Sequence, residues 1–170
     1  GMGIQLDNSR HCRHEMEHLL RDQISRDVAV MTGAEANGYG EMKFGAGRDE
    51  EGLVLMITLG KGIGVALFDQ GVLVRNLCLE PVLQSWNEPE LWENASLPYA
   101  DVAVEDAGWG RWAGRVEKYV VEMEAKIQPD VLIIGGAAAR SFEKWVPLMT
   151  QVDAQVKRAE LGHLAGVKGA

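Results

Sequence analysis

The sequence predicts a single α/β domain, and two features of its hydrophobic pattern lead to this prediction. Short runs rich in aliphatic and branched residues, at 53–57, 65–68 and 130–134, have the length of buried strands. The stretch 109–127 repeats apolar residues at helical spacing, which predicts an amphipathic helix. A chain of 170 residues, 46% of them hydrophobic, can bury one core of this kind.

Composition and charge exclude several classes of function. The net charge of −8 argues against nucleic-acid binding, which normally needs a basic surface. No apolar segment is long enough to span a bilayer, and the N-terminus lacks the basic-then-apolar build of a signal peptide. The two cysteines, Cys12 and Cys78, allow at most one bridge and suggest a reducing compartment. We therefore expect a cytoplasmic protein with neither a membrane nor a nucleic acid as its partner.

The first part of the chain predicts a helix, a strand and a second helix. Residues 9–23 alternate charges with apolar residues at helical spacing, so 1–26 is an N-terminal helix region of the single domain 1–170. Residues 27–32 form a short strand candidate. Residues 34–44 predict a helix weakened by its internal glycines, and a polar glycine loop then leads into the central strands.

The remaining elements follow from turn residues and apolar runs. Residues 69–71 predict a hairpin turn that returns the chain through 72–74, and 81–98 predict an irregular excursion. After the strand at 130–134, a helix is expected to open at 135–137 and to continue to about 148. A last strand around 154–156 and a helix of small residues over 159–167 close the chain.

The glycine loop after the first central strand is the strongest candidate for a binding site. Thr58, Gly60, Lys61, Gly62 and Gly64 combine a hydroxyl and a cation with glycines at alternate positions. Glycine leaves no Cβ between the backbone and a ligand, so bare N–H groups can converge on an anion. The alternative is a tight hairpin that needs glycine only for its turn, because short glycine patterns are common.

A second candidate follows the strand at 130–134. Gly135, Gly136 and Ala137 stand between that strand and the start of the predicted helix. The first N–H groups of a helix have no partner within the helix, so this turn is favourable for phosphate. The alternative is that small residues only let the helix pack closely on the sheet.

A literal match to the zinc-peptidase pattern H-E-x-x-H lies in the first helix. His14 and His18 would share one helix face, and Glu15 could activate a water. The helix is strongly charged, however, and only Glu35 or Glu41 remain as further ligands. A solvated polar face explains the same residues, and we expect no zinc.

Three blocks of the sequence are informative together: residues 34–47, 55–76 and 129–136, followed by shorter stretches at 159–161 and 165–166. In this order they resemble the C-terminal half of the bacterial ROK sugar kinases, and among these the polyphosphate glucokinases. The likeness covers most of the chain from about residue 27 onward, and the blocks together are far more specific than any one alone. The resemblance implies one lobe of the actin-like (ribonuclease H-like) kinase fold, with a mixed sheet flanked by helices.

The resemblance also implies roles for the two glycine segments. In that family the loop at 60–64 contacts the donor phosphates, and the turn at 135–137 lies near the adenosine. The implied cofactors are ATP or polyphosphate with Mg²⁺. The phosphate- or nucleotide-binding residues are then Thr58, Gly60, Lys61, Gly62, Gly64, Gly135, Gly136 and Ala137.

The departures from the family pattern concern catalysis. The family's catalytic aspartate, the general base for the sugar hydroxyl, follows an asparagine, but this chain has Thr32 and Gly33 there. We therefore expect no catalytic residue, with Gly33 in the aspartate's position. The sugar-binding E-x-G-H segment is replaced at 77–81, Lys61 stands where threonine is usual, and no N-terminal lobe is recognised.

These departures predict a degenerate, polyphosphate-glucokinase-like lobe that keeps a phosphate- or nucleotide-binding surface without phosphorylating sugar by itself. Phosphoryl transfer needs a carboxylate that orients the attacking hydroxyl, and glycine cannot replace it. Two alternatives remain: an active half of a glucokinase whose N-terminal lobe is on another chain, and a non-catalytic interaction module. Because half of a two-lobed fold leaves a face uncovered, we expect a homodimer or a separate N-terminal-lobe chain as the partner.

Overall fold

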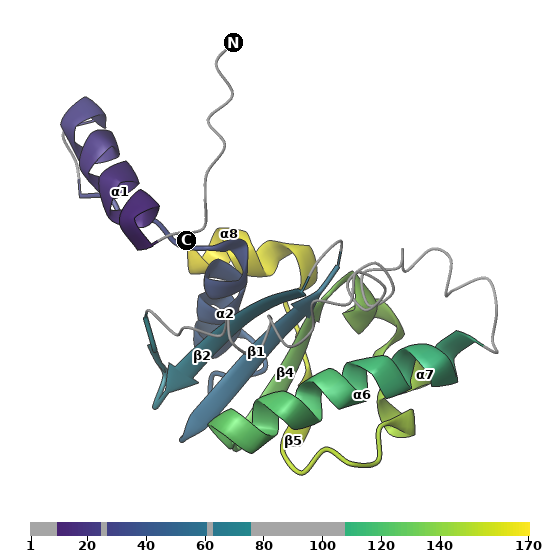
Figure 1. Ribbon diagram of the computed structural model, residues 1–170. Helices are drawn as coiled ribbons and strands as arrows, with labels where there is room; N and C mark the ends of the chain where they lie inside the picture. The colour runs from purple at the N-terminus through teal and green to yellow at the C-terminus, as the bar shows by residue number, and fades with distance from the viewer. Residues whose placement is uncertain (1–9, 25–26, 61–62, 76–107) are drawn as a thin grey trace. The chain divides into compact units, whose positions relative to one another are not determined.

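The computed structural model describes residues 10–24, 27–60, 63–75 and 108–170 (Figure 1). The chain divides into two compact units, Gly1–Thr32 and Gly33–Ala170. Within the described ranges, no helix combines the length and the apolar character needed to cross a bilayer.

The first unit contains helix α1 (Arg10–Ile24) and the segment 27–32. α1 confirms the helix predicted near the N-terminus, but the strand predicted at 27–32 is wrong, because this segment is irregular. The Glu17 carboxylate accepts a hydrogen bond from the Val30 N–H at 2.9 Å, and Arg21 donates to the Val28 carbonyl at 3.2 Å. Side chains of α1 thus occupy backbone groups that a neighbouring strand would otherwise bind.

The second unit is built on a mixed five-stranded sheet in the order β3-β2-β1-β4-β5. β2 runs antiparallel to both of its neighbours, β1 and β3, whereas β4 runs parallel to both β1 and β5. The central strands were therefore predicted correctly. The strands are β1 (Leu53–Leu59), β2 (Ile63–Asp69), β3 (Val72–Leu73), β4 (Val131–Gly136) and β5 (Gln155–Arg158).

Helices cover both faces of this sheet (Figure 1). α6 (Gly108–Ile127) lies on one face, and α2 (Gly33–Phe44) with α8 (Ala165–Gly169) lies on the other. Successive side chains of a strand point to opposite faces. In β1, Leu55 and Ile57 accordingly pack in the core cluster of α6, and Met56 packs in the cluster on the α2 side. This double burial explains the nearly continuous apolar run that predicted the strand.

The core under α6 is formed by the residues that its helical spacing placed inward. Trp112, Val116, Tyr119, Val120 and Met123 are all buried, as predicted. The Trp112 ring meets the Trp145 ring edge-on, with centroids 4.6 Å apart. Edge-to-face pairs of this kind add to the free energy of burial.

The continuous helix predicted from 135–137 to 148 is wrong. The chain instead forms η1 (Ala137–Ser141), one turn of α7 (Phe142–Trp145) and η2 (Val146–Leu148). Pro147 has no N–H to donate, which disfavours a regular α-helix at this end. The buried Trp145 indole also donates to the Ala138 carbonyl at 3.1 Å, an acceptor that an α-helix would give to Phe142.

Three smaller predictions had mixed outcomes. The hairpin turn is confirmed: Gln70 and Gly71 have φ of 48° and 79°, the positive values that favoured two-residue hairpins require. The last strand is confirmed as β5. The closing helix begins later than predicted, as η3 (Gly162–Leu164) followed by the short α8.

The glycines of α2 allow close packing. A Cβ at Gly40 would overlap the Ala165 carbonyl of α8, and one at Gly38 would overlap the Phe68 ring. α8 and β2 can approach α2 this closely because glycine has no side chain, and the low helix propensity of these glycines is the cost of that packing.

Glu41 joins three parts of the second unit. It is fully buried near the C-terminal end of α2, with 0% of its surface exposed. Its carboxylate accepts hydrogen bonds from the N–H groups of Ala46 at 3.0 Å, Glu160 at 3.0 Å and Leu161 at 2.8 Å. One buried anion thus holds the end of α2 against the loop that follows it and the segment that follows β5.

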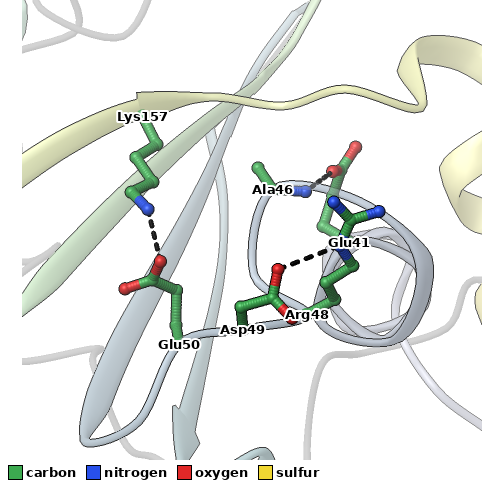
Figure 2. A network of polar contacts seen from close by, with 6 residues as sticks. All are labelled: Glu41, Ala46, Arg48, Asp49, Glu50 and Lys157. Atoms are coloured by element: carbon green, nitrogen blue, oxygen red, sulfur yellow. Dashed lines mark hydrogen bonds and ion pairs between the residues drawn. The ribbon is translucent and has the colours of Figure 1, made fainter.

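Ion pairs support the same region (Figure 2). Lys157 of β5 pairs with Glu50, and both side chains are largely buried. Arg48 pairs with Asp49 at 3.0 Å, but this pair is exposed and contributes little.

Acidic side chains of α6 hold a second segment. Glu117 accepts hydrogen bonds from the N–H groups of Thr150 and Gln151, the latter at 2.7 Å. Glu124 accepts one from Ala154 at 2.7 Å. These carboxylates fasten the chain between η2 and β5 to α6, although it has no regular structure of its own.

We predict that Glu41→Gln lowers the free energy of unfolding by about 3 kcal/mol. The amide keeps one acceptor oxygen but turns an NH₂ group toward N–H donors, which leaves buried donors without a partner. Urea unfolding measures the change. The matched control is Glu51→Gln at an exposed position, for which a change within about 0.5 kcal/mol is expected. Equal unfolding midpoints for both variants would contradict the role given to Glu41.

A second prediction concerns alkaline pH. Burial raises the pKa of the Tyr119 phenol above its ordinary value of 10.0. The unfolded chain releases this proton first, so the stability from neutral Tyr119 is complete below pH 10.0 and declines as pH rises above it. Tyr119→Phe should therefore show a smaller loss of stability between about pH 9 and 11 than the unchanged chain does. Parallel slopes of unfolding free energy against pH would contradict this prediction.

Candidate functional site

The two glycine segments predicted to bind phosphate meet at one edge of the sheet. β1 and β4 are parallel neighbours, with Thr58 opposite Gly135 and Leu59 opposite Gly136. The β1–β2 loop therefore begins beside the β4–η1 turn, at the carboxyl ends of both strands. Ligands of open α/β sheets commonly bind at this edge. Two predicted site residues, Lys61 and Gly62, lie outside the described residues.

The N-terminus of α2 lies at the same edge. A Cβ built on Gly64 would lie 2.9 Å from the Ala34 Cβ, so the first turn of α2 packs directly against β2. Gly33, the first residue of α2, is exposed, and a Cβ there would meet no atom within 4 Å. α2 has 12 residues, and its first N–H groups carry the positive end of the helix dipole.

Thr58 and Gly64 have structural roles within this site. The Thr58 hydroxyl donates a hydrogen bond to the Gly64 carbonyl at 3.2 Å, across the hairpin. A Cβ at Gly64 would also lie only 2.5 Å from the Thr58 Oγ1. Packing against Thr58 and Ala34 is thus sufficient reason for glycine at 64.

The other glycines of this site differ in whether packing or backbone conformation requires a glycine. Gly136 has φ 80° and ψ −165°, a conformation open essentially to glycine alone, and a Cβ there would overlap the Leu59 carbonyl. Gly135 is buried, and a Cβ there would overlap only the flexible end of Met56, with ordinary contacts to Ala159 and Thr58. Gly60 is exposed with open space around it, so its backbone is accessible at the rim of the edge.

The backbone N–H groups at this edge have the chemistry that an anion site needs. The edge combines the N–H groups of the α2 N-terminus with an exposed glycine and the beginning of η1 at Ala137. η1 has only 5 residues, so it adds little dipole of its own. The sequence predicted that a helix beginning at 135–137 would direct its positive N-terminal end toward this edge. In the structure, the longer helix whose N-terminus lies here is α2.

The described residues contain no group of three His, Cys, Asp or Glu side chains that could hold a metal ion. His18, from the H-E-x-x-H pattern, lies 3.1 Å from the Asp22 carboxylate on an exposed surface. Glu41, one of the two further ligands considered, is committed to three backbone N–H groups. The side chains of His14 and Glu15 lie outside the described part of the chain.

Sequence reasoning missed the structural role of Glu41. The available signal was an acidic residue in the last turn of a glycine-containing helix, with Gly45, Ala46 and Gly47 following directly after that helix. A Cβ at Gly45 would overlap the Glu41 carboxylate, so the glycine there makes room for the buried anion.

Comparison with known proteins places this geometry in a family context. No family model matches the sequence. The solved inorganic polyphosphate/ATP-glucomannokinase of Arthrobacter sp. strain KM superposes with a TM-score of 0.64 at 24% identity, over 99% of this chain and 64% of that one. A ROK family transcriptional regulator, a homologue of the E. coli MLC protein, gives a TM-score of 0.67 at 13% identity, over 91% and 53% of the two chains. The fold is therefore the actin-like kinase fold of the ROK proteins.

The sequence match is more specific. The polyphosphate glucokinase of Mycobacterium tuberculosis (strain CDC 1551 / Oshkosh) is 32% identical over 145 residues, which is 85% of this chain and 53% of that protein. This chain is a homologue of polyphosphate glucokinases of the ROK family, which confirms the resemblance found in the sequence. It spans about half the length of the curated relatives that it matches.

We predict that Gly136→Ala lowers the free energy of unfolding by about 3 kcal/mol, through backbone strain and overlap with Leu59. Gly60→Ala is the matched control, since its Cβ meets open space, and its effect should stay within about 1 kcal/mol. Urea unfolding of both variants measures the difference. If the Gly60 variant were the less stable one, the packing explanation for Gly136 would be wrong.

Proposed function

We propose that this chain is a polyphosphate-glucokinase-like lobe that binds a phosphate donor but does not by itself phosphorylate a sugar. The single observation behind this proposal is Gly33, at the start of α2 and beside the glycine edge. The resemblance to ROK kinases assigns the catalytic aspartate to this position. Glycine has no group that can take the proton of a sugar hydroxyl.

The expected loss of rate is large. General-base catalysis contributes about 10²–10⁴ to rate. The space beside Gly33 is open. Among the described residues, the sequence identified none nearby that could act as the base in its place. Glu35 is buried two residues further along α2, so it projects from another side of the helix.

Binding of the phosphate donor is the part of the kinase function that the remaining residues support. The donor class is ATP or polyphosphate, as the relatives' names indicate. Backbone N–H groups at the α2 N-terminus and around Gly60 suit phosphate oxygens. Mg²⁺ would be carried mainly by the phosphates, since it keeps several waters and takes few protein ligands in such sites.

A second candidate function is a non-catalytic interaction module. It is favoured by the similarity in fold to a ROK family transcriptional regulator, because the same fold occurs there under a regulator's name. Calorimetry with ATP, ADP and polyphosphate distinguishes the two candidates. Binding of one of them supports the donor-binding lobe, and binding of none supports the interaction module.

The catalytic part of the proposal is tested by a glucose-phosphorylation assay with ATP and with polyphosphate, each with Mg²⁺. We expect no turnover by the purified chain above a heat-treated blank. Clear turnover by the unchanged chain would overturn the proposal, since it would require a base other than residue 33.

The location of the binding surface is tested with a charge at its rim. Gly60→Asp places an anion at the exposed rim of the edge and should weaken ATP or polyphosphate binding about three- to tenfold through charge repulsion. Gly60→Asn, of nearly the same size but neutral, is the matched control and should bind as the unchanged chain does. Both variants should fold, because a Cβ at 60 meets no neighbour. Equal affinities for both variants would place the phosphate elsewhere.

A further inference from the structure

A cavity lies at the edge of the sheet opposite the two glycine segments. Its volume is about 510 Å³, which is within the range of small-molecule binding sites. It opens between the C-terminal end of α6 and the irregular chain that leads into β5. Asp130 and Ala154 line it and come directly before β4 and β5, so the cavity borders the amino ends of these parallel strands.

The surroundings of this cavity carry negative charge. Glu124, Asp130 and Asp153 line it, and none of the described residues in its lining is basic. The last carbonyl groups of α6 have no partner within the helix, and in a helix of 20 residues they carry the negative end of its dipole. Lys126, the basic residue of the last turn, is not part of the lining. The cavity therefore favours a cation.

Two of the three carboxylates are available to a ligand. Glu124 accepts hydrogen bonds from the N–H groups of Ala154 at 2.7 Å and Asp153 at 3.3 Å, one with each oxygen. One oxygen of Asp130 accepts from the Leu53 N–H at 2.7 Å, which leaves its other oxygen for a ligand. The Asp153 side chain is exposed, and its carboxylate accepts no hydrogen bond from a described residue.

An organic cation suits these carboxylates better than a metal ion does. They do not form a group that could hold a metal, since the described residues contain no such group of three side chains. Val121, Ala125 and Pro129 supply apolar surface in the lining, which suits a stem of methylene groups. Two separate carboxylates beside apolar surface match a molecule that carries an ammonium group at each end of such a stem.

We propose that this cavity binds a linear alkyl diamine. One ammonium group binds Asp153 and the other binds the second oxygen of Asp130, while the stem lies against Val121 and Ala125. Both contacts are charge-assisted hydrogen bonds, which are stronger than neutral ones. Glu124 holds the chain that carries Asp153 and adds a third negative charge. This inference does not depend on the proposed function, because the glycine segments lie at the carboxyl ends of the strands and the cavity at their amino ends.

Calorimetry of the full chain at low salt tests the proposal, with putrescine as the diamine and n-butylamine as the control that has one ammonium group. We expect saturable binding of putrescine to a single site. Its affinity should exceed that of n-butylamine about fivefold or more, because the second ammonium group adds a second attraction. No saturable binding of putrescine, or equal affinities for the two amines, would overturn the proposal.

Three variants test the location of the site. Asp153→Asn keeps the size of the side chain, removes its charge and should weaken putrescine binding about fivefold or more. Glu143→Gln is the matched control, because it removes the same charge from an exposed position on α7 outside the cavity, and it should bind as the unchanged chain does. Ala125→Leu adds bulk to the cavity wall at an exposed helix position and should weaken binding of both amines.

The fold of each variant is checked by its urea unfolding midpoint, which should change little because all three positions are exposed. Equal putrescine affinities of the Asp153→Asn and Glu143→Gln variants would show that net charge, and not the cavity, attracts the amine. That result would overturn the proposal, and so would unchanged binding by the Ala125→Leu variant.

Discussion

The buried carboxylate of Glu41 is the interaction on which the second unit depends. It accepts hydrogen bonds from three backbone N–H groups that belong to the loop after α2 and to the segment after β5. Those donors would otherwise be buried without a partner, at a cost of about 1–3 kcal/mol each. Because the bonds fix the C-terminal end of α2, they also help to set where its N-terminus meets the edge of the sheet.

The structure also changes how the glycines at 60–64 and 135–136 are interpreted. In the sequence, the glycines at 60–64 and 135–136 indicated phosphate binding as a group. The structure separates them: Gly64 and Gly136 are needed for packing and backbone conformation whether or not a ligand binds. Their presence is therefore weak support for a ligand. The stronger support is the convergence of the β1 loop, the β4 turn and the α2 N-terminus at one edge, with Gly60 open to solvent.

The fold was largely predictable from the sequence, and the two clear errors of that prediction have the same origin. Apolar runs buried on both faces predicted β1 and β4, and the inward face of α6 followed from its spacing. The strand at 27–32 and the long helix to 148 were wrong because side chains took up backbone groups that the regular structure would have used. Glu17 and Arg21 do so in the first case, and the Trp145 indole does so in the second. A local pattern does not reveal such a competitor.

The sequence by itself determined the α/β class, most strand and helix positions, the relation to ROK sugar kinases and the replacement of the expected aspartate by Gly33. These depend on residue identity and on short-range periodicity, both of which can be read locally. Only the tertiary structure decided that the two glycine segments are neighbours, that Gly33 stands beside them in open space, and that Glu41 is a buried anchor. Each of these depends on contacts between residues far apart in the chain, and no local pattern encodes that distance.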